Sequence, residues 1–306
     1  GKTAVSIRTA TIAASAGRKP ILFTMGRGGP ETPMVLLPKK LTVNELIRLA
    51  ESGIHSAGDM FESSIFSGMT VIGSRRAGGG LSASVFYTNL RKAVSEASKF
   101  ESDLYIFEGS GTTEPPVEGA SILLVPSFLP LSSFDDPFVR MRICRSICAV
   151  ITAAEPPFAS KEHIIQIRER LLEIQPQIKV CATLFRPKPA ENIEKTKVVV
   201  ATTAKEDAFN IIWRHLEETY GCTVVAMTGS LANKVKLRDD LTTLFSEKNV
   251  DVLLVELKAA SIEVAARLAQ AAEKRVVLME NIIEDLKNWD TNYESVLKQM
   301  ISENLK

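Results

Sequence analysis

The first three residues, Gly1, Lys2 and Thr3, are of the types that hold phosphate groups at the start of a helix. They match the end of the loop pattern G-x-x-x-x-G-K-[ST], in which backbone N–H groups surround nucleotide phosphates. In such a loop the lysine reaches the β- and γ-phosphates and the threonine hydroxyl binds Mg²⁺. We therefore predict that these residues contact ATP. We also expect that the chain is a fragment of a longer nucleotide-dependent protein, cut inside its own ATP site, and that this fragment alone binds ATP poorly.

Glu108 is the acid that would complete such a site. It ends the short apolar run 104–107, which delivers a carboxylate to the carboxyl edge of a sheet, where open α/β folds place ligands. Because Mg²⁺ prefers oxygen ligands, we predict Thr3 and Glu108 as the metal ligands. Gly109 and Gly111 would let the backbone approach a phosphate closely, with Ser110 between them. A solvated turn after a strand is the alternative interpretation.

Two further glycine-rich segments combine flexible backbone with guanidinium groups, which bind phosphate bidentately. Segment 25–30 contains Arg27, Gly28 and Gly29, and segment 73–80 contains Arg75 and Arg76. Either one alone could be a loop without function. Three such loops at successive strand ends predict a site for several phosphates, with the arginines in both catalytic and substrate-binding roles.

Four other polar residues lie at spacings that could carry chemistry. His55, Asp59 and Glu62 would share one side of a helix, as a substrate contact, a second metal contact or a proton acceptor. A solvated helix face is the competing interpretation. Lys258 stands where a helix begins, a position at which the helix dipole disfavours a cation, and a bound anion would resolve this conflict. The alternative is a lysine extended into solvent.

The elements that would position these residues follow an α/β pattern, in which short apolar runs alternate with helix-period segments. We expect a mostly parallel, doubly wound P-loop-type sheet followed by a smaller α/β domain. The predicted strands are 19–25, 69–73, 103–108, 121–126, 147–152, 178–184, 197–202, 223–228, 250–256 and 275–280. The predicted helices are 4–16, 42–50, 58–67, 86–100, 134–145, 160–174, 203 onward, 233–246 and 259–272, with a terminal helix after Asn281.

Capping boxes, T-x-x-E, are predicted to begin the helices at Thr42 and Thr203. Residues 185–192 are predicted to form a linker, because two closely spaced prolines interrupt regular structure. We therefore expect a P-loop-like core over residues 1–188, with its first strand and most of the phosphate loop missing, and a C-terminal α/β domain over residues 189–306.

Composition narrows the function classes. The net charge is +1, which gives no reason to expect nucleic acid or an acidic membrane surface as a partner. The longest apolar runs have the length of strands and are too short to span a bilayer. The four cysteines have neither C-x-x-C spacing nor a nearby histidine, so we expect small buried thiols in a reducing cytoplasm and assign them no metal.

At these motifs the chain resembles the archaeal-type cyclic 2,3-diphosphoglycerate synthetase family. The matching segments are GKTAVS, MGRGGP, LTVNELIRLAESGIHSAGDMFE, VIGSRRAGGGL, LYIFEGSG, AEPPFAS, TLFRPKP, MTGSLANK and LLVELKAASIEVAARLA, which extend from residue 1 to about 282. The FEGSG segment is also similar to the VEGAGG of dethiobiotin synthetase, a P-loop enzyme that makes a phosphoric anhydride. Two features depart from the family: its N-terminal domain is not in this sequence, and the residues after about Glu280 differ from the short tails expected.

The resemblance implies an ATP- and Mg²⁺-dependent ligase that joins the two phosphates of 2,3-bisphosphoglycerate into an intramolecular anhydride, releasing ADP and phosphate. It also implies a cytoplasmic enzyme and a homodimer. Two alternatives stay open. A related P-loop kinase or ligase would act on another anionic small molecule, and a partner-regulated P-loop ATPase switch would need none of the glycine-arginine loops.

Overall fold

The computed structural model describes residues 1–304 apart from 27, 40, 57, 79–84 and 110–116. The chain forms two compact units that are interleaved in sequence. The first unit contains residues 1–35, 69–185 and 283–306, and the second contains residues 36–68 and 186–282. The predicted domain boundary after residue 188 stays a prediction.

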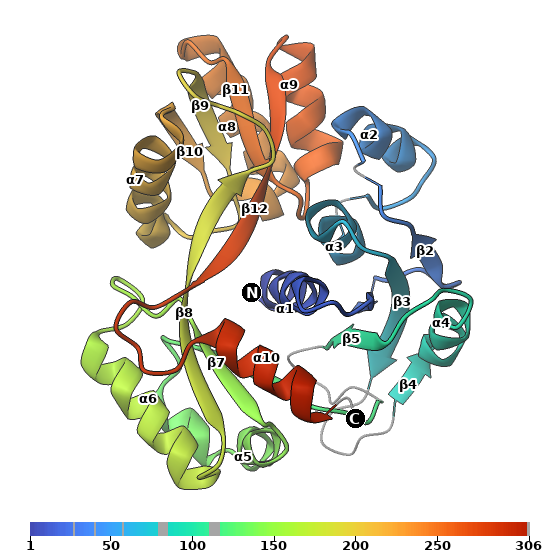
Figure 1. Ribbon diagram of the computed structural model, residues 1–306. Helices are drawn as coiled ribbons and strands as arrows, with labels where there is room; N and C mark the ends of the chain where they lie inside the picture. The colour runs from blue at the N-terminus through green and yellow to red at the C-terminus, as the bar shows by residue number, and fades with distance from the viewer. Residues whose placement is uncertain (27, 40, 57, 79–84, 110–116, 305–306) are drawn as a thin grey trace. The chain divides into compact units, whose positions relative to one another are not determined.

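Parallel strands and covering helices build the first unit (Figure 1). Its helices are α1 (Lys2–Ser15), α4 (Leu90–Ala97), α5 (Pro137–Cys144), α6 (Lys161–Ile174) and α10 (Tyr293–Asn304), with the 3₁₀ helix η1 (Leu131–Asp135). Its strands are β1 (Pro20–Gly26), β3 (Val71–Gly78), β4 (Val85–Thr88), β5 (Leu104–Glu108), β6 (Ile122–Pro126) and β7 (Cys148–Thr152). Strands β2 (Met34–Leu36), β8 (Lys179–Pro189) and β12 (Arg275–Asp285) have residues in both units.

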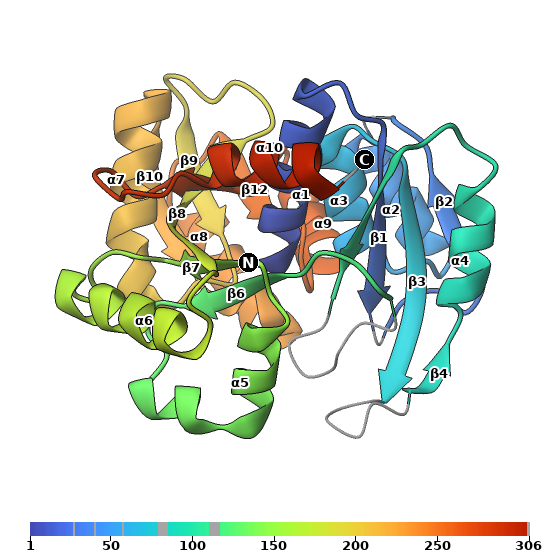
Figure 2. The same ribbon diagram turned by 60° about the horizontal axis from the view of Figure 1, so that its bottom comes forward.

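One sheet of the first unit has β1 between β3 and β5, and both pairings are parallel. Figure 2 shows β1 and β3 side by side with their arrowheads at the same end. Phe23 of β1 stacks on Phe107 of β5 at 4.5 Å between ring centroids, and both rings belong to one apolar cluster. The two parallel pairings place the carboxyl ends of the three strands at one edge.

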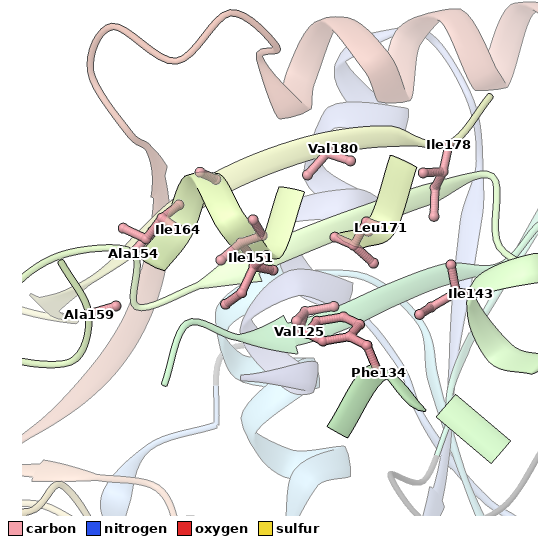
Figure 3. Close-up of a cluster of buried hydrophobic side chains, with 13 residues drawn as sticks. Val125, Phe134, Ile143, Ile151, Ala154, Ala159, Ile164, Leu171, Ile178 and Val180 are labelled. Atoms are coloured by element: carbon pink, nitrogen blue, oxygen red, sulfur yellow. The ribbon is translucent and has the colours of Figure 1, made fainter. Parts of the chain in front are cut away.

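Strands β6, β7 and β8 of the first unit are also parallel to one another. A cluster of buried aliphatic side chains lies between these strands and α6, and Figure 3 shows Leu171 and Ile164 beside Ile151 and Val125. Phe134 of η1 closes the cluster and is fully buried. The apolar period of α6 therefore explains its position on this sheet.

The second unit is a smaller α/β unit. Its helices are α2 (Val43–Glu51), α3 (Asp59–Ser67), α7 (Phe209–Tyr220), α8 (Lys234–Glu247) and α9 (Arg267–Ala271), with the short 3₁₀ helices η2 (Glu206–Ala208) and η3 (Ser230–Ala232) and the π-helical segment η4 (Ser261–Ala266). Its strands β9 (Lys197–Ala201), β10 (Thr223–Thr228) and β11 (Val252–Glu256) join β12 in the order β10-β9-β11-β12, all parallel.

The predicted α/β class and the mostly parallel pairing are confirmed. The capping box at Thr42 is also confirmed: Thr42 accepts from the backbone of Glu45, whose side chain accepts in return from the backbone of Thr42. A terminal helix is present as α10, although β12 first continues through Asp285.

Four sequence predictions need correction. The predicted linker is wrong in its first half, because β8 continues to Pro189; its ladder to β7 ends at Ala182, so neither proline has to donate on that side. The predicted loop 73–80 is a strand as far as Gly78, paired with the unforeseen antiparallel β4. Thr203 does not cap a helix, because η2 and α7, which follow it, have Lys205 and Ala208 as their N-caps; the Thr203 hydroxyl donates to Glu256. Cys144 is exposed, whereas the other three cysteines are buried.

Candidate functional site

Thr3 and Glu108 are in direct contact in the first unit, although 105 positions separate them in sequence. The Thr3 hydroxyl donates to Oε1 of Glu108 at 2.9 Å, and both residues are buried. Ser6, one turn further along α1, lies with its hydroxyl 3.4 Å from Oε2 of the same carboxylate and 2.9 Å from the carbonyl oxygen of Thr3. The start of α1 and the end of β5 thus form one buried cluster of oxygen atoms.

Strand register explains why these groups meet. Glu108 is the last residue of β5 and pairs with Thr24 of β1, while Arg75 of β3 pairs with Gly26 of β1. From strand spacing and rise, the Cα atoms of Arg75 and Glu108 are separated by roughly 12 Å. Both residues therefore lie at the carboxyl edge of one parallel sheet, where ligands bind in such folds.

Arg75 and Arg76 lie within β3, so their side chains leave the strand on opposite faces. Arg75 is half-buried: its guanidinium is 3.1 Å from a carboxylate oxygen of Glu31 and 6.0 Å from the ring centroid of Tyr87. Arg76 is buried. The two arginines could therefore reach one ligand only from opposite faces of the sheet, which the loop interpretation did not foresee.

The segment with Gly28 and Gly29 is fixed on β3. A Cβ atom added to Gly29 would overlap the backbone carbonyl of Ser74, whereas one added to Gly28 would meet open space. The Asn89 side chain donates to the carbonyl oxygens of Pro30 and Glu31, both at 2.9 Å, and accepts from the backbone of Arg75. Gly29 is thus required by close backbone packing, a reason that does not involve a phosphate ligand.

Three predicted site residues, Arg27, Ser110 and Gly111, lie outside the described residues. Gly109 follows β5 directly, and Lys2 is exposed at the first position of α1. Among the side chains that the structure describes, no group of three or more histidine, cysteine, aspartate or glutamate residues could hold a metal ion. Any cation at Glu108 would therefore depend on hydroxyl, ligand or water oxygens beside this one carboxylate.

The predicted residues His55, Asp59 and Lys258 belong to the second unit. The single helix face proposed for His55, Asp59 and Glu62 is wrong, because α3 begins only at Asp59, after the N-cap Gly58. His55 precedes the helix and lies 3.7 Å from Glu263, which also pairs with Lys234.

Lys258 already has an anionic neighbour within the second unit. Its ammonium group is 3.5 Å from Oε1 of Glu62, a side chain with only 4% of its surface exposed. Burial alone would lower the pKa of Lys258, but the carboxylates of Glu62, Glu256 and Asp59 outweigh that effect and raise it. The conflict between a lysine and a helix N-terminus is therefore resolved inside the protein.

The sequence analysis missed two features of these sites. Ser6 reaches the carboxylate of Glu108, and its position three residues after Thr3 was the available signal. Glu256 ends β11 as Glu108 ends β5, and it accepts from the Thr202 and Thr203 hydroxyls, the backbone N–H of Thr203 and the side-chain amide of Asn281 at 2.6–2.9 Å. Only the tertiary structure shows this second network.

Comparison with known proteins identifies the family of the chain. The model described as "Cyclic 2,3-diphosphoglycerate synthetase, P-loop domain" matches residues 1–184, and the corresponding C-terminal domain model matches residues 189–282. The chain belongs to the cyclic 2,3-diphosphoglycerate synthetase family. The family resemblance and the P-loop-type fold predicted from the motifs are therefore confirmed.

Similar proteins carry the name cyclic 2,3-diphosphoglycerate synthetase. The protein from Methanothermus fervidus is 38% identical over 92% of this chain and 62% of its own length. That from Methanothermobacter thermautotrophicus is 35% identical over 92% of this chain and 61% of its own length. That from Thermococcus sibiricus is 37% identical over 92% and 64%. The chain thus spans less than two thirds of the length of these family members.

Proposed function

We propose that the protein containing this chain closes 2,3-bisphosphoglycerate into its cyclic phosphoanhydride with ATP, releasing ADP and phosphate. The contact between Thr3 and Glu108 carries this proposal. It joins the hydroxyl of a G-K-T sequence at a helix start to an acid at a strand end, the two groups that bind Mg²⁺ beside a nucleotide in P-loop enzymes. The names of the similar family members support the choice of reaction.

The residues present suit a nucleotide with its magnesium ion. Thr3, Ser6 and Glu108 offer only oxygen atoms, which are the ligands of hard cations, and Thr3 and Glu108 would hold the ion. A bound Mg²⁺ would neutralise charge on the phosphates of ATP. Lys2 and the backbone N–H groups at the start of α1 would contact the nucleotide phosphates, with Gly1, Gly109 and Gly111 leaving space for their approach.

The arginines at the same sheet edge would hold the bisphosphate. Guanidinium groups bind phosphate bidentately and screen the repulsion between two phosphates of one small molecule. We assign this role to Arg75 and Arg76, with Arg27, Gly28, Gly29 and Ser110 from the neighbouring loops. Arg75 would exchange its exposed partner Glu31 for substrate, at little cost because surface ion pairs contribute weakly.

The reaction divides into two displacements. An oxygen of one substrate phosphate attacks the γ-phosphorus of ATP, and the bond from that phosphorus to the β-phosphate oxygen breaks, releasing ADP. An oxygen of the other substrate phosphate then attacks the phosphorus of the first substrate phosphate. The bond from that phosphorus to the oxygen of the transferred γ-phosphoryl group breaks, which releases phosphate. Ring closure within one molecule gains from high effective concentration once the arginines hold the substrate folded.

The remaining site predictions concern the second unit. We keep His55, Asp59 and Lys258 as proposed substrate contacts. For Lys258 this role requires an incoming phosphate to compete with Glu62. A homodimer and a cytoplasmic location likewise remain proposals. No helix among the described residues is long and apolar enough to cross a membrane.

The test is incubation of the full-length protein with ATP, Mg²⁺ and 2,3-bisphosphoglycerate, followed by ³¹P NMR. We expect ADP, phosphate and a new phosphoanhydride resonance in equal amounts, and loss of all three without Mg²⁺. The matched comparison uses 2- or 3-phosphoglycerate, which lacks one of the two phosphates. ADP formation without a cyclic product would refute the assignment.

A further inference from the structure

Residues 286–304 form the last part of the first unit and lie outside both regions that the family models match, which end at residues 184 and 282. This segment, the C-terminal strap, consists of a turn after β12 followed by α10. Figures 1 and 2 show α10 beside α1, the helix that begins with Lys2 and Thr3. The strap therefore contacts the element to which we assign nucleotide binding.

The strap is fixed to the first unit at several points before it reaches α1. The backbone N–H of Leu286 donates to Ala182 of β8, and the indole N–H of Trp289 donates to Val180 of the same strand, at 2.8 and 2.9 Å. Asp285 accepts from the backbone of Tyr293 and the side chain of Asn292, which orders the first turn of α10. These hydrogen bonds hold the turn and the start of α10 on β8 and β12 without any contribution from α1.

Two contacts then join α10 to α1. The hydroxyls of Tyr293 and Thr9 are 2.7 Å apart and buried, and Arg8 pairs with Glu294 at 2.8 Å on the surface. A buried apolar cluster that includes Val5, Ile12 and Leu297 surrounds the hydroxyl pair. The single proton of Thr9 goes to the carbonyl oxygen of Val5 at 2.7 Å, so Tyr293 must be the donor to Thr9.

Burial raises the pKa of Tyr293 above its usual range, so its hydroxyl stays protonated and remains a donor. The resulting chain of hydrogen bonds runs from Tyr293 through Thr9 to Val5, whose own N–H donates to the carbonyl oxygen of Gly1. Thr9 lies seven residues after Lys2, which is two helical turns. A fixed Thr9 therefore fixes the rotation of α1 about its axis and its position along that axis, and with them the placement of its first turn.

We propose that Tyr293 is a positioning residue for nucleotide binding, which holds α1 through Thr9 so that Lys2 and Thr3 meet the phosphates and Glu108. This rests on the proposed function of α1 as the phosphate-binding helix. Tyr293 acts through Thr9, so its effect on binding is indirect.

The experiment uses the full-length protein and the substitutions Tyr293→Phe and Thr9→Val, singly and together. Each removes the same hydrogen bond from one side. We expect each to weaken MgATP binding about fivefold in calorimetry, the effect of one net hydrogen bond. The double variant should be no weaker than either single variant, because the two residues act through one contact. Hydrogen exchange should also become faster at the amides of α1.

Trp289→Phe is the matched control, because it removes a hydrogen bond of the strap to β8 and leaves the contacts with α1. It should lower the melting temperature about as much as Tyr293→Phe, with MgATP affinity and exchange in α1 unchanged. Equal behaviour of Tyr293→Phe and Trp289→Phe in both measurements would overturn the proposal. If Tyr293→Phe proves too unstable, the milder Glu294→Gln at the exposed pair should shift exchange in α1 in the same direction.

The outcomes separate this inference from the proposed function. A wild-type protein that binds MgATP but forms no cyclic product refutes the reaction and leaves the positioning role to be decided by the affinities. A wild-type protein that does not bind MgATP refutes the role in nucleotide binding directly. Slower product formation in Tyr293→Phe with an unchanged MgATP affinity would also contradict the proposal, because positioning of α1 must act on binding.

Discussion

Glu108 and Glu256 hold the same place in their units. Each is the last residue of a parallel strand, and each is buried, with 8% and 4% of its surface exposed. Their donors differ. Glu108 is reached by two hydroxyls of α1, Thr3 and Ser6, whereas Glu256 accepts a backbone N–H and two hydroxyls from the residues that follow β9 and a side-chain amide from within β12.

The role of an acid at a strand end therefore depends on which groups donate to it. Thr3 and Ser6, two donors of Glu108, lie on a helix that begins with the G-K-T sequence, and hydroxyl oxygens can turn from donating to a carboxylate to binding a cation. The donors of Glu256 include N–H groups, which cannot bind a cation. We infer that Glu108 serves a ligand and that Glu256 joins neighbouring strands.

The same substitution at both positions should separate these roles. Glu108→Gln keeps an oxygen for the Thr3 hydroxyl but removes the charge that would hold Mg²⁺, so we expect at least about a hundredfold loss of cyclic product formation. The melting temperature should change little. The measurement is ADP release and ³¹P NMR with the full-length protein at saturating ATP, and activity near the wild-type level would exclude Glu108 as a metal ligand.

Glu256→Gln should have the opposite profile. One of its two oxygens becomes an NH₂ group, which faces either the N–H and hydroxyl of Thr203 or the donors Thr202 and Asn281. We expect a loss of about 3 kcal/mol in the free energy of unfolding, because buried donors lose a charged acceptor. Urea denaturation measures the loss. Protein that remains folded should retain its activity, and an inactive but fully stable variant would contradict the structural role.

Lys258→Met tests whether another buried carboxylate of the second unit, Glu62, also has a structural role. The substitution removes the positive charge of Lys258 from beside the buried carboxylate of Glu62. We expect the free energy of unfolding to fall by about 2 kcal/mol. Because the folded-state pKa of Lys258 is raised, the stabilising contribution of its charge is fully present below the ordinary pKa of lysine. That contribution is lost only as pH rises through the folded-state pKa.

The double variant Glu62→Gln/Lys258→Met provides the control. It should recover most of the lost stability, because no charge is then left unpaired. The alternative outcome is a raised KM for 2,3-bisphosphoglycerate with unchanged stability. That result would favour the proposed substrate contact and show that Lys258 leaves Glu62 when substrate binds.

Local sequence signals were sufficient to predict that Thr3 and Glu108 lie close together. A G-K-T sequence before a helix and an apolar strand that ends in an acid are both short-range patterns, and parallel topology brings such strand ends to one edge. The alternation of strands and helices likewise predicted the α/β class, because periodicity within each segment reflects burial.

Long-range pairing accounts for the predictions that failed. Gly73 to Gly78 has loop-like composition, yet β1 and β4 pair with it as a strand. Pro187 and Pro189 suggested a linker, but an unpaired side of β8 accepts them. The contact of Tyr293 with Thr9 spans 284 positions, and no local pattern predicts it. Composition shows what a segment prefers, and its neighbours decide what it forms.

Glu280 of β12 offers the smallest and most specific test of the role of donors. It is a third buried acid, in the middle of β12, and burial raises its pKa, an effect that the nearby Lys188 only partly offsets. A carboxyl with a raised folded-state pKa contributes to stability below its unfolded pKa and loses that contribution as pH rises through the folded value. Glu280→Gln should therefore stabilise the protein slightly at pH 7. The gain should disappear when the pH falls below the ordinary glutamate range, as measured by urea denaturation at both pH values. Equal stabilisation at both pH values would mean that packing, and not ionisation, distinguishes Glu280 from Glu108 and Glu256.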